Sequence, residues 1–282
     1  MARKLLVLAL VLSALLVPTN ASGVWGGELD TAHPQVGAMY FDYEATGAPR
    51  IDGLVCSGSF AGDSKAGPFG GYHVFLLAGH CLPPAELGIP AAALFVSFSN
   101  NASVTDTHSL VSSPIQVQSY HQMPGFGHDL GDLRDLGILL LPKDSVPGPI
   151  APVQLAPAGF LDTLKSQGTL KFREVDIVGY GSIPNWDDPG PTSFTSDAMR
   201  RSGTTIITGL GKAFVKMQQN SGIGTGSGLC FGDSGSPQID QATGRVISVT
   251  TGGNGQCNSH NINYRVDTPQ ARDFLGQFLA LP

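Results

Sequence analysis

The chain alternates between short apolar segments and clusters of glycine, proline, asparagine and serine. The apolar segments are rich in β-branched and aromatic residues, a pattern typical of β-strands separated by turns. The expected strands are Val36–Tyr40, Gly53–Phe60, His73–Ala78, Leu94–Ser99, Ile115–Tyr120, Leu136–Leu141, Val175–Gly179, Thr204–Thr208, Ala213–Met217, Pro237–Asp240, Val246–Thr251 and Ile262–Val266. About twelve strands are too many for one small sandwich and suit two six-stranded barrels. We therefore predict an all-β fold.

Apolar residues recur with the spacing of an α-helix only at the C-terminal end of the chain. Asp267 or Thr268 can cap a helix there, and Pro269 suits its first turn. Four apolar residues then recur at helical spacing and are expected to pack into the core: Phe274, Leu275, Phe278 and Leu279. The pattern predicts a C-terminal helix.

A proline-rich stretch is predicted to join the two barrels. Residues 142–157 contain five prolines and little hydrophobic periodicity, which indicates a linker near the middle of the mature chain. The first barrel is accordingly placed at residues 24–141, and the second barrel with the helix at residues 158–282.

The first 23 residues have the features of a secretory signal peptide. Arg3 and Lys4 precede an apolar stretch, and small residues follow it. The stretch has about 13 residues, whereas a membrane-spanning helix needs ~20. We therefore expect residues 1–23 to be removed on export, and the mature protein to be secreted with no membrane attachment.

The composition and net charge exclude some classes of binding partner and of fold. Only 13% of residues are charged and the formal net charge is −6, so the chain offers no basic surface for nucleic acid or anionic membranes. Glycine and proline number 37 and 20, too many for a coiled coil, and a hydrophobic content of 41% argues against disorder.

The four cysteines are expected to form disulfides. They form an even set without a close C-x-x-C pair, which argues against a zinc site, and an exported chain meets an oxidising environment. Four cysteines allow three pairings, and spacing alone does not choose among them. Pairing of sequence neighbours, Cys56 with Cys81 and Cys230 with Cys257, closes the shortest loops.

The segment Cys230-Phe-Gly-Asp-Ser-Gly-Ser-Pro237 carries a candidate nucleophile, Ser234. A serine hydroxyl needs a base to accept its proton and donors to hold the oxyanion that follows. The flanking glycines allow a tight turn that aims two backbone N–H groups at one point. An ordinary Gly-Ser turn is the alternative, and Ser236 excludes the G-x-S-x-G elbow of α/β-hydrolases.

Two further segments supply a base and an acid. Leu76-Leu-Ala-Gly-His-Cys81 places His80 at the end of an apolar strand, and Asp135 opens the apolar run that ends at Leu141. A carboxylate entering such a run needs a partner, and an imidazole N–H is a good one. Asp129 and Asp132 are the competing carboxylates, but neither is followed by a continuous strand.

Together these residues resemble the chymotrypsin/trypsin-like serine peptidase family. His80, Asp135 and Ser234 follow the family's order, and their segments resemble its "T-A-A-H-C" and "C-x-G-D-S-G-G-P" motifs. Val55-Cys-Ser-Gly-Ser59 is similar to "C-G-G-S", and Val178-Gly-Tyr-Gly181 to "V-G-W-G". The resemblance implies two six-stranded antiparallel barrels, a site between them and both neighbour disulfides. Ser236 departs from the motif, where the family has glycine.

The resemblance also implies roles for these residues. Ser234 attacks the scissile carbonyl, His80 transfers the proton, Asp135 orients the imidazole, and the N–H groups of Gly232 and Ser234 hold the oxyanion. The expected protein is a secreted, monomeric endopeptidase that acts on proteins or peptides and needs no cofactor or metal. The alternatives are a non-catalytic binding protein on the same fold and an esterase of another fold.

Activation and specificity follow from the same resemblance. Val24-Trp-Gly-Gly27 resembles the family's mature start, whose freed amine pairs with the aspartate before the nucleophile, here Asp233. The specificity pocket is expected to include Gly228 at its base, Gly252 or Gly253 on one wall, with Gly252 preferred, and Asn261 or Ile262 on the other, with Ile262 preferred. An uncharged base predicts an uncharged, small-to-medium residue before the scissile bond, unless a carboxylate such as Asp240 reaches the pocket.

Overall fold

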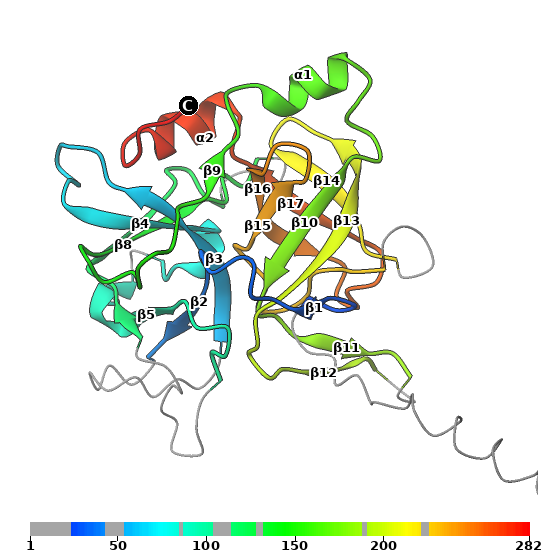
Figure 1. Ribbon diagram of the computed structural model, residues 1–282, viewed down its shortest axis with the longest axis horizontal. Coiled ribbons are helices and arrows are strands. Elements are labelled where there is room, and N and C mark those ends of the chain that lie inside the picture. Colours follow the sequence, from blue (N-terminus) through cyan, green and yellow to red (C-terminus); the bar gives the residue numbers. More distant parts are fainter. Residues whose placement is uncertain are drawn as a thin grey trace, which may run out of the picture.

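The computed structural model describes residues 24–42, 54–84, 87–103, 114–127, 132–187, 191–220 and 226–282. Two barrel-like β-sheets lie side by side, one formed by the first half of the chain and the other mainly by the second half (Figure 1). The predicted all-β class is confirmed. The predicted signal peptide, residues 1–23, lies outside the described residues.

The first sheet has seven strands in the order β6-β5-β2-β3-β4-β8-β7, all paired antiparallel. They are β2 (Val36–Phe41), β3 (Leu54–Asp63), β4 (Tyr72–Leu77), β5 (Leu94–Ser97), β6 (Ile115–Gln116), β7 (Ser119–Gln122) and β8 (Gly137–Pro142). The outermost strands, β6 and β7, belong to one continuous segment, residues 115–122. This segment therefore brings the two ends of the sheet together.

The uninterrupted apolar run of β8 is explained by burial on both faces. Successive strand residues point to opposite sides. Leu139 and Leu141 join a hydrophobic cluster confined to the first sheet. Ile138 and Leu140 join a larger cluster that also contains residues of the second sheet and of the C-terminal helix. A strand with only one buried face would have alternated apolar and polar residues.

The second sheet closes into a six-stranded barrel. Its strands are β10 (Glu174–Gly179), β13 (Arg201–Leu210), β14 (Phe214–Gln218), β15 (Pro237–Asp240), β16 (Arg245–Gly253) and β17 (His260–Arg265). They run in the order β13-β10-β15-β16-β17-β14, and pairing of β14 with β13 completes the circle. A separate hairpin, β11 (Ile183–Asn185) and β12 (Ser193–Thr195), extends below this barrel in Figure 1.

Two short strands from elsewhere in the chain are added to the second sheet. β1 (Glu28–Leu29) pairs with β13, and β9 (Gln154–Leu155) pairs parallel to β16. The range 24–141 assigned to the first barrel thus begins with a segment that the second sheet holds. The proline-rich range 142–157 likewise ends in a strand of the second sheet.

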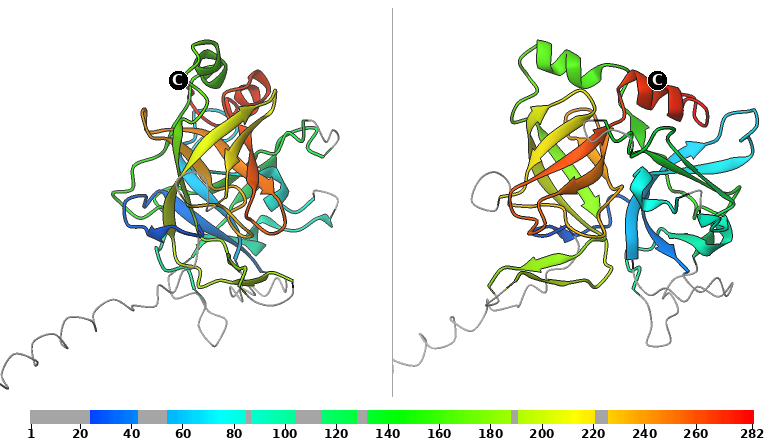
Figure 2. Two further views of the ribbon diagram at one scale, coloured as in Figure 1. Left: turned by 90° about the vertical axis from the view of Figure 1, so that its right-hand side faces the viewer. Right: turned by 180° about the vertical axis from the view of Figure 1, so that it is seen from behind.

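Two α-helices and two 3₁₀ turns complete the fold. The predicted C-terminal helix is α2 (Pro269–Leu275), capped by the Thr268 side chain, and it lies at the end of the molecule where the two sheets meet (Figure 2). Helix α1 (Phe160–Ser166) was not predicted, because its buried residues, Leu161 and Leu164, span a single turn. The 3₁₀ turns are Gly79–Cys81 and Ala91–Ala93. Within the described residues, no helix has the length and apolar character needed to cross a membrane.

Candidate active site

The ends of two paired strands bring His80 and Asp135 together. Leu77 of β4 is paired with Gly137 of β8, and His80 and Asp135 lie just beyond these ends. The ring Nδ1 of His80 lies 2.9 Å from one Asp135 carboxylate oxygen. The backbone N–H of His80 donates to the other oxygen over 2.8 Å. Asp135 is fully buried, so this carboxylate fixes both the backbone and the ring of His80.

The competing carboxylates have other positions. Asp132 accepts a hydrogen bond from the Tyr264 hydroxyl over 3.2 Å and lies 3.7 Å from the Arg134 side chain. Asp129 lies outside the described residues. Asp135 is therefore the candidate carboxylate that the structure places against His80.

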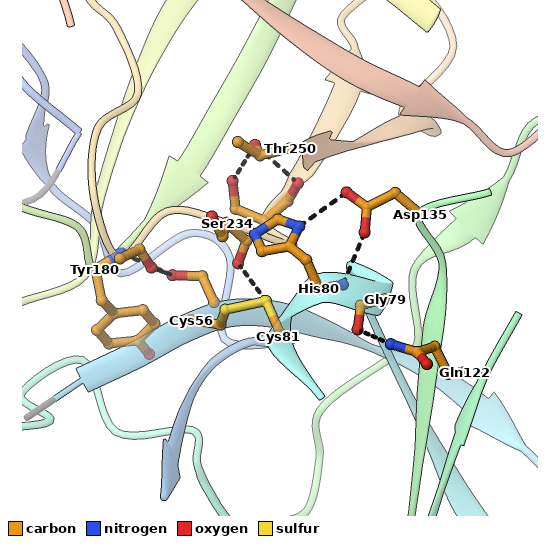
Figure 3. Close-up of a disulfide and its surroundings, with 12 residues drawn as sticks. Cys56, Gly79, His80, Cys81, Gln122, Asp135, Tyr180, Ser234 and Thr250 are labelled. Carbon is orange, nitrogen blue, oxygen red and sulfur yellow. Dashed lines mark hydrogen bonds and ion pairs between the residues drawn. A yellow bond between two sulfur atoms is a disulfide. The ribbon is translucent and has the colours of Figure 1, made fainter. Parts of the chain in front are cut away.

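Ser234 lies on the other side of the His80 ring, so that the ring separates it from Asp135 (Figure 3). Within the described part of the chain, no hydrogen bond joins the Ser234 hydroxyl to His80. Such bonds are often long before substrate binds. The carbonyl of Ser234 accepts the backbone N–H of Ser57 over 2.9 Å. Strand β3 of the first sheet thus fixes the nucleophile loop of the second.

Gly235 permits this close approach between the sheets. Its φ is +82°, and a Cβ there would lie 2.5 Å from the Ser57 carbonyl oxygen and 2.7 Å from the Ala78 nitrogen. Any other residue would clash with backbone atoms on both sides. The glycine after Ser234 is therefore required by sterics.

Two backbone N–H groups beside Ser234 are free to bind an anion. The carbonyl of Phe231 accepts the Ser182 N–H over 2.6 Å, and that of Asp233 accepts the Ser236 N–H over 2.9 Å. In a trans peptide the C=O and N–H point in opposite directions. The N–H groups of Gly232 and Ser234 are thereby turned away from these partners, and neither has an acceptor within the described residues. Unpaired N–H donors beside the nucleophile are what an oxyanion hole requires.

Asp233 is a fully buried carboxylate with no cationic side chain against it in the described part of the chain. It accepts the backbone N–H groups of Gly181, over 2.8 Å, and Cys230, over 2.9 Å. Burial raises its pKa to about 7, although the two hydrogen bonds lower it. Val24 is also fully buried and packs with Leu229, the residue before Cys230.

Ser236, the departure from the expected motif, belongs to a buried polar network behind the nucleophile. Its hydroxyl lies 2.9 Å from the Thr250 hydroxyl, to which the Gln238 side-chain amide donates over 2.7 Å. The Ser248 hydroxyl donates to the Gln238 carbonyl over 2.9 Å. The Ser236 hydroxyl is thus hydrogen-bonded rather than buried without a partner. No local sequence pattern indicated this network, whose members are Ser236, just before β15, and residues of β15 and β16.

A cavity of about 210 Å³ opens beside Ser234, where the specificity pocket was expected. Its lining residues are Leu229, Cys230, Phe231, Ser234, Thr250, Thr251, Gly252, Gly253, Asn254, Gly255, Cys257 and Asn261. Gly252 lines this cavity. Of the two residues considered for the other wall, Asn261 lines it and Ile262 does not. Successive residues of a strand face opposite sides, so Asn261 and Ile262, which are adjacent in β17, cannot both face the cavity.

Gly228, expected at the base of the specificity pocket, does not line this cavity. A Cβ at Gly228 would lie 2.4 Å from the indole nitrogen of Trp25. Trp25 packs against the Cys230–Cys257 disulfide and makes an edge contact with Trp186, at a ring separation of 5.0 Å. The indole therefore covers the position where the pocket base was expected.

Asp240, the carboxylate considered as an alternative for the pocket, does not line it either. It is buried and binds the Arg173 guanidinium and the Thr243 hydroxyl. Its charge is thus already compensated elsewhere in the second sheet.

Both disulfides join the predicted neighbours. Cys56–Cys81 ties β3 to the turn that carries His80, and Cys230–Cys257 ties the nucleophile loop to the rim of the 210 Å³ cavity. Among the described residues, the grouping of possible metal ligands is Cys56, Cys81 and His80. Its sulfur atoms are bonded to each other and His80 is held by Asp135, so the group does not offer thiolate ligands.

Two larger cavities also touch the candidate residues. One of about 580 Å³ includes Ser234, Gly232 and Phe231 in its lining, and one of about 690 Å³ includes His80. Open space thus borders the candidate nucleophile and base on more than one side.

Comparison with known proteins identifies the family. The chain matches the family model described as Trypsin over residues 66–275, whereas no curated protein sequence matches it. Among solved structures, HL collagenase aligns with a TM-score of 0.60 and 14% identity, covering 92% of this chain and 96% of that one. The Vibrio cholerae VesB protease aligns with a TM-score of 0.57 and 16% identity, covering 88% of this chain and 65% of that one. These likenesses establish the fold, and the family model spans well over half of the sequence. The chain therefore belongs to the trypsin family of peptidases.

Proposed function

We propose that this protein is a secreted serine endopeptidase. Ser234 attacks the scissile carbonyl, and His80 accepts its proton and passes it to the leaving amine. Asp135 holds the imidazole with Nδ1 protonated and stabilises the imidazolium that forms. The N–H groups of Gly232 and Ser234 bind the oxyanion. The position of His80 between the buried Asp135 and Ser234 is the observation that carries this proposal.

Cleavage within a chain is supported by the space around the site. An endopeptidase must hold substrate residues on both sides of the scissile bond. The cavities of about 580 and 690 Å³ border Ser234 and His80 respectively, in addition to the 210 Å³ cavity. The substrates are accordingly proteins or peptides. Secretion is supported by the two disulfides, which persist in oxidising compartments.

Activation is proposed to follow removal of residues 1–23. The new amine of Val24 would carry a positive charge, and the buried Asp233 carboxylate lacks a cationic partner among the described residues. Pairing of the two charges would stabilise Asp233 in its ionised form and hold the adjacent oxyanion hole. Signal cleavage after Gly23 gives this amine directly, whereas cleavage after Ala21 leaves two residues for another protease. N-terminal sequencing decides between them, because an active form beginning at Ser22 would refute the direct route.

A serine-directed phosphonate tests the catalytic proposal. We expect the processed protein to form a covalent adduct at Ser234 that peptide mapping locates, and the Ser234→Ala variant to form none. The Ser236→Ala variant is the matched control, since it removes a neighbouring hydroxyl that faces the buried network instead. Absence of an adduct on correctly processed protein would show that the chain is not a serine peptidase.

A further inference from the structure

The Ser57 hydroxyl is a buried polar group that contacts the nucleophile loop (residues 230–236) directly. Ser57 lies on β3 of the first sheet and is fully buried. Its hydroxyl donates to the Gly232 carbonyl over 2.9 Å and accepts the backbone N–H of Tyr180 over 3.1 Å. Because an N–H can only donate, the bond from Tyr180 leaves the single hydroxyl proton for Gly232. One side chain thus joins the first sheet, the segment after β10 and the nucleophile loop.

The Gly232 carbonyl belongs to the peptide that lies between the two free N–H groups. Three consecutive peptides connect residues 231–234, and the two outer ones carry the free N–H groups. The carbonyls of the outer peptides accept backbone N–H groups. The central peptide is held at its N–H by the Cys230 carbonyl, over 3.0 Å, and at its carbonyl by the Ser57 hydroxyl. Among the described residues, Ser57 is the one whose side chain binds a carbonyl of these three peptides.

The loop has little stiffness of its own at Gly232. The φ of Gly232 is +93°, and glycine populates more backbone conformations than any other residue. A Cβ at this position would lie 2.9 Å from the Leu54 side chain and 3.1 Å from the Gly181 backbone, so a stiffer residue does not fit. The rotation of the central peptide must therefore be fixed by contacts from outside the loop, and the Ser57 hydroxyl supplies one of them.

Ser57 is also a departure from the family motif. In the segment Val55-Cys-Ser-Gly-Ser59 it stands where "C-G-G-S" has its first glycine. A glycine there would keep the backbone N–H that donates to the Ser234 carbonyl, but it would offer no hydroxyl to Gly232. The side-chain contact is therefore an addition made by the sequence of this chain.

We propose that Ser57 is a positioning residue for catalysis, whose hydroxyl holds the peptide after Gly232 so that the two free N–H groups converge on the oxyanion. Ser57 is buried and does not touch the substrate. Its effect is felt in the transition state, where the oxyanion forms, and hardly in the bound ground state. Loss of the hydroxyl should therefore lower kcat and leave KM nearly unchanged. The inference rests on the proposed serine peptidase function.

The test compares Ser57→Ala with Ser59→Ala in the hydrolysis of a peptide amide that the unmodified enzyme cleaves. Both substitutions remove a fully buried hydroxyl from β3, but the Ser59 hydroxyl has no partner among the described residues. Ser57→Ala is expected to lower kcat about tenfold, the contribution of one hydrogen bond. Removal of an oxyanion donor itself costs more, ~10²–10³-fold. Ser59→Ala is expected to keep the kcat of the unmodified enzyme.

An inhibitor that forms an oxyanion measures the same effect without turnover. When a peptidyl trifluoromethyl ketone binds, the Ser234 oxygen bonds to its carbonyl carbon, the Ser234 proton passes to His80, and the ketone oxygen becomes an oxyanion. Ser57→Ala should weaken this inhibitor about tenfold, in parallel with kcat/KM. The pH dependence of kcat/KM should keep its midpoint, because the Ser57 hydroxyl bonds to Gly232 and Tyr180 and not to His80.

Several results would overturn the inference. They are an unchanged kcat in Ser57→Ala, a raised KM at unchanged kcat, and an equal loss of kcat in Ser59→Ala. A merely structural role predicts a lower melting temperature with unchanged kcat in the folded enzyme, so the same data distinguish the two roles. Ser57→Gly, which restores the residue of the family motif, gives the same comparison if Ser57→Ala does not fold.

Phosphonate labelling of the unmodified enzyme separates failure of this inference from failure of the proposed function. Labelling of Ser234, together with an unchanged kcat in Ser57→Ala, removes the role of Ser57 and leaves the serine peptidase standing. Absence of both labelling and cleavage in the unmodified enzyme removes the serine peptidase and this inference together.

Discussion

The buried carboxylate of Asp233 makes the stability of the unprocessed chain depend on pH. Burial raises its pKa from the ordinary value of 3.8 to about 7. Since the raised pKa belongs to the folded state, the folded chain holds this proton more tightly than the unfolded chain does. Its contribution to stability is present below pH 3.8 and is lost as the pH rises to about 7. At about 1.4 kcal/mol per pH unit, the loss over this range amounts to about 4 kcal/mol.

Two chains that differ at the N-terminus test this reasoning. One begins at Ser22 and the other at Val24, and both carry Ser234→Ala so that they cannot digest themselves. The free energy of unfolding is measured with urea from pH 4 to pH 8. We expect the Ser22 chain to lose about 4 kcal/mol more than the Val24 chain between pH 4 and pH 7, because the Val24 ammonium keeps the Asp233 pKa low.

Asp233→Asn in the Ser22 chain is the control, because it removes the titrating group. The substitution should abolish the extra pH dependence, even if it lowers stability by a constant amount at every pH. The reasoning is refuted if both chains show the same pH dependence, or if Asp233→Asn leaves that of the Ser22 chain unchanged.

Two further predictions concern the catalytic geometry. Asp135→Asn should lower kcat about 10⁴-fold because the imidazole of His80 would take the wrong tautomer. Full activity in this variant, together with loss of activity in Asp129→Asn, would show that Asp129 is the carboxylate that orients His80. Gly235→Ala should abolish activity and lower the melting temperature, since the added Cβ would lie 2.5 Å from the Ser57 carbonyl oxygen. A variant with unchanged kcat/KM and an unchanged melting temperature would contradict the steric argument.

The strand pattern and the candidate catalytic residues could be predicted from local sequence. Apolar segments between turn residues mark the strands, and His80, Asp135 and Ser234 each stand in a distinctive segment. Contacts between distant residues leave no local pattern. Trp25 covers Gly228 from about 200 positions away along the chain, and the sequence around Gly228 does not indicate this contact.

The choice between Asn261 and Ile262 could not be made from the sequence, for a different reason. The two residues are adjacent in β17, and a shift of one residue along a strand selects the opposite face, so only Asn261 lines the 210 Å³ cavity. The hydrogen bond from Asn263 to Asn261 joins residues two apart on one face of β17, which an alternating pattern permits but does not reveal. The pairing of β17 with β14 and β16 fixes the register.

The edge contact between Trp25 and Trp186 gives the molecule a built-in optical probe. These are the two tryptophans of the chain: Trp25 forms a β-bridge with Gly228, and Trp186 directly follows β11 of the separate hairpin. The tryptophan fluorescence of the protein therefore originates from one place in the molecule. Undocking of the N-terminal segment would expose the Trp25 indole, now 3% exposed, to water. A red-shifted spectrum would then report the position of this segment in real time, without any label and independently of peptide hydrolysis.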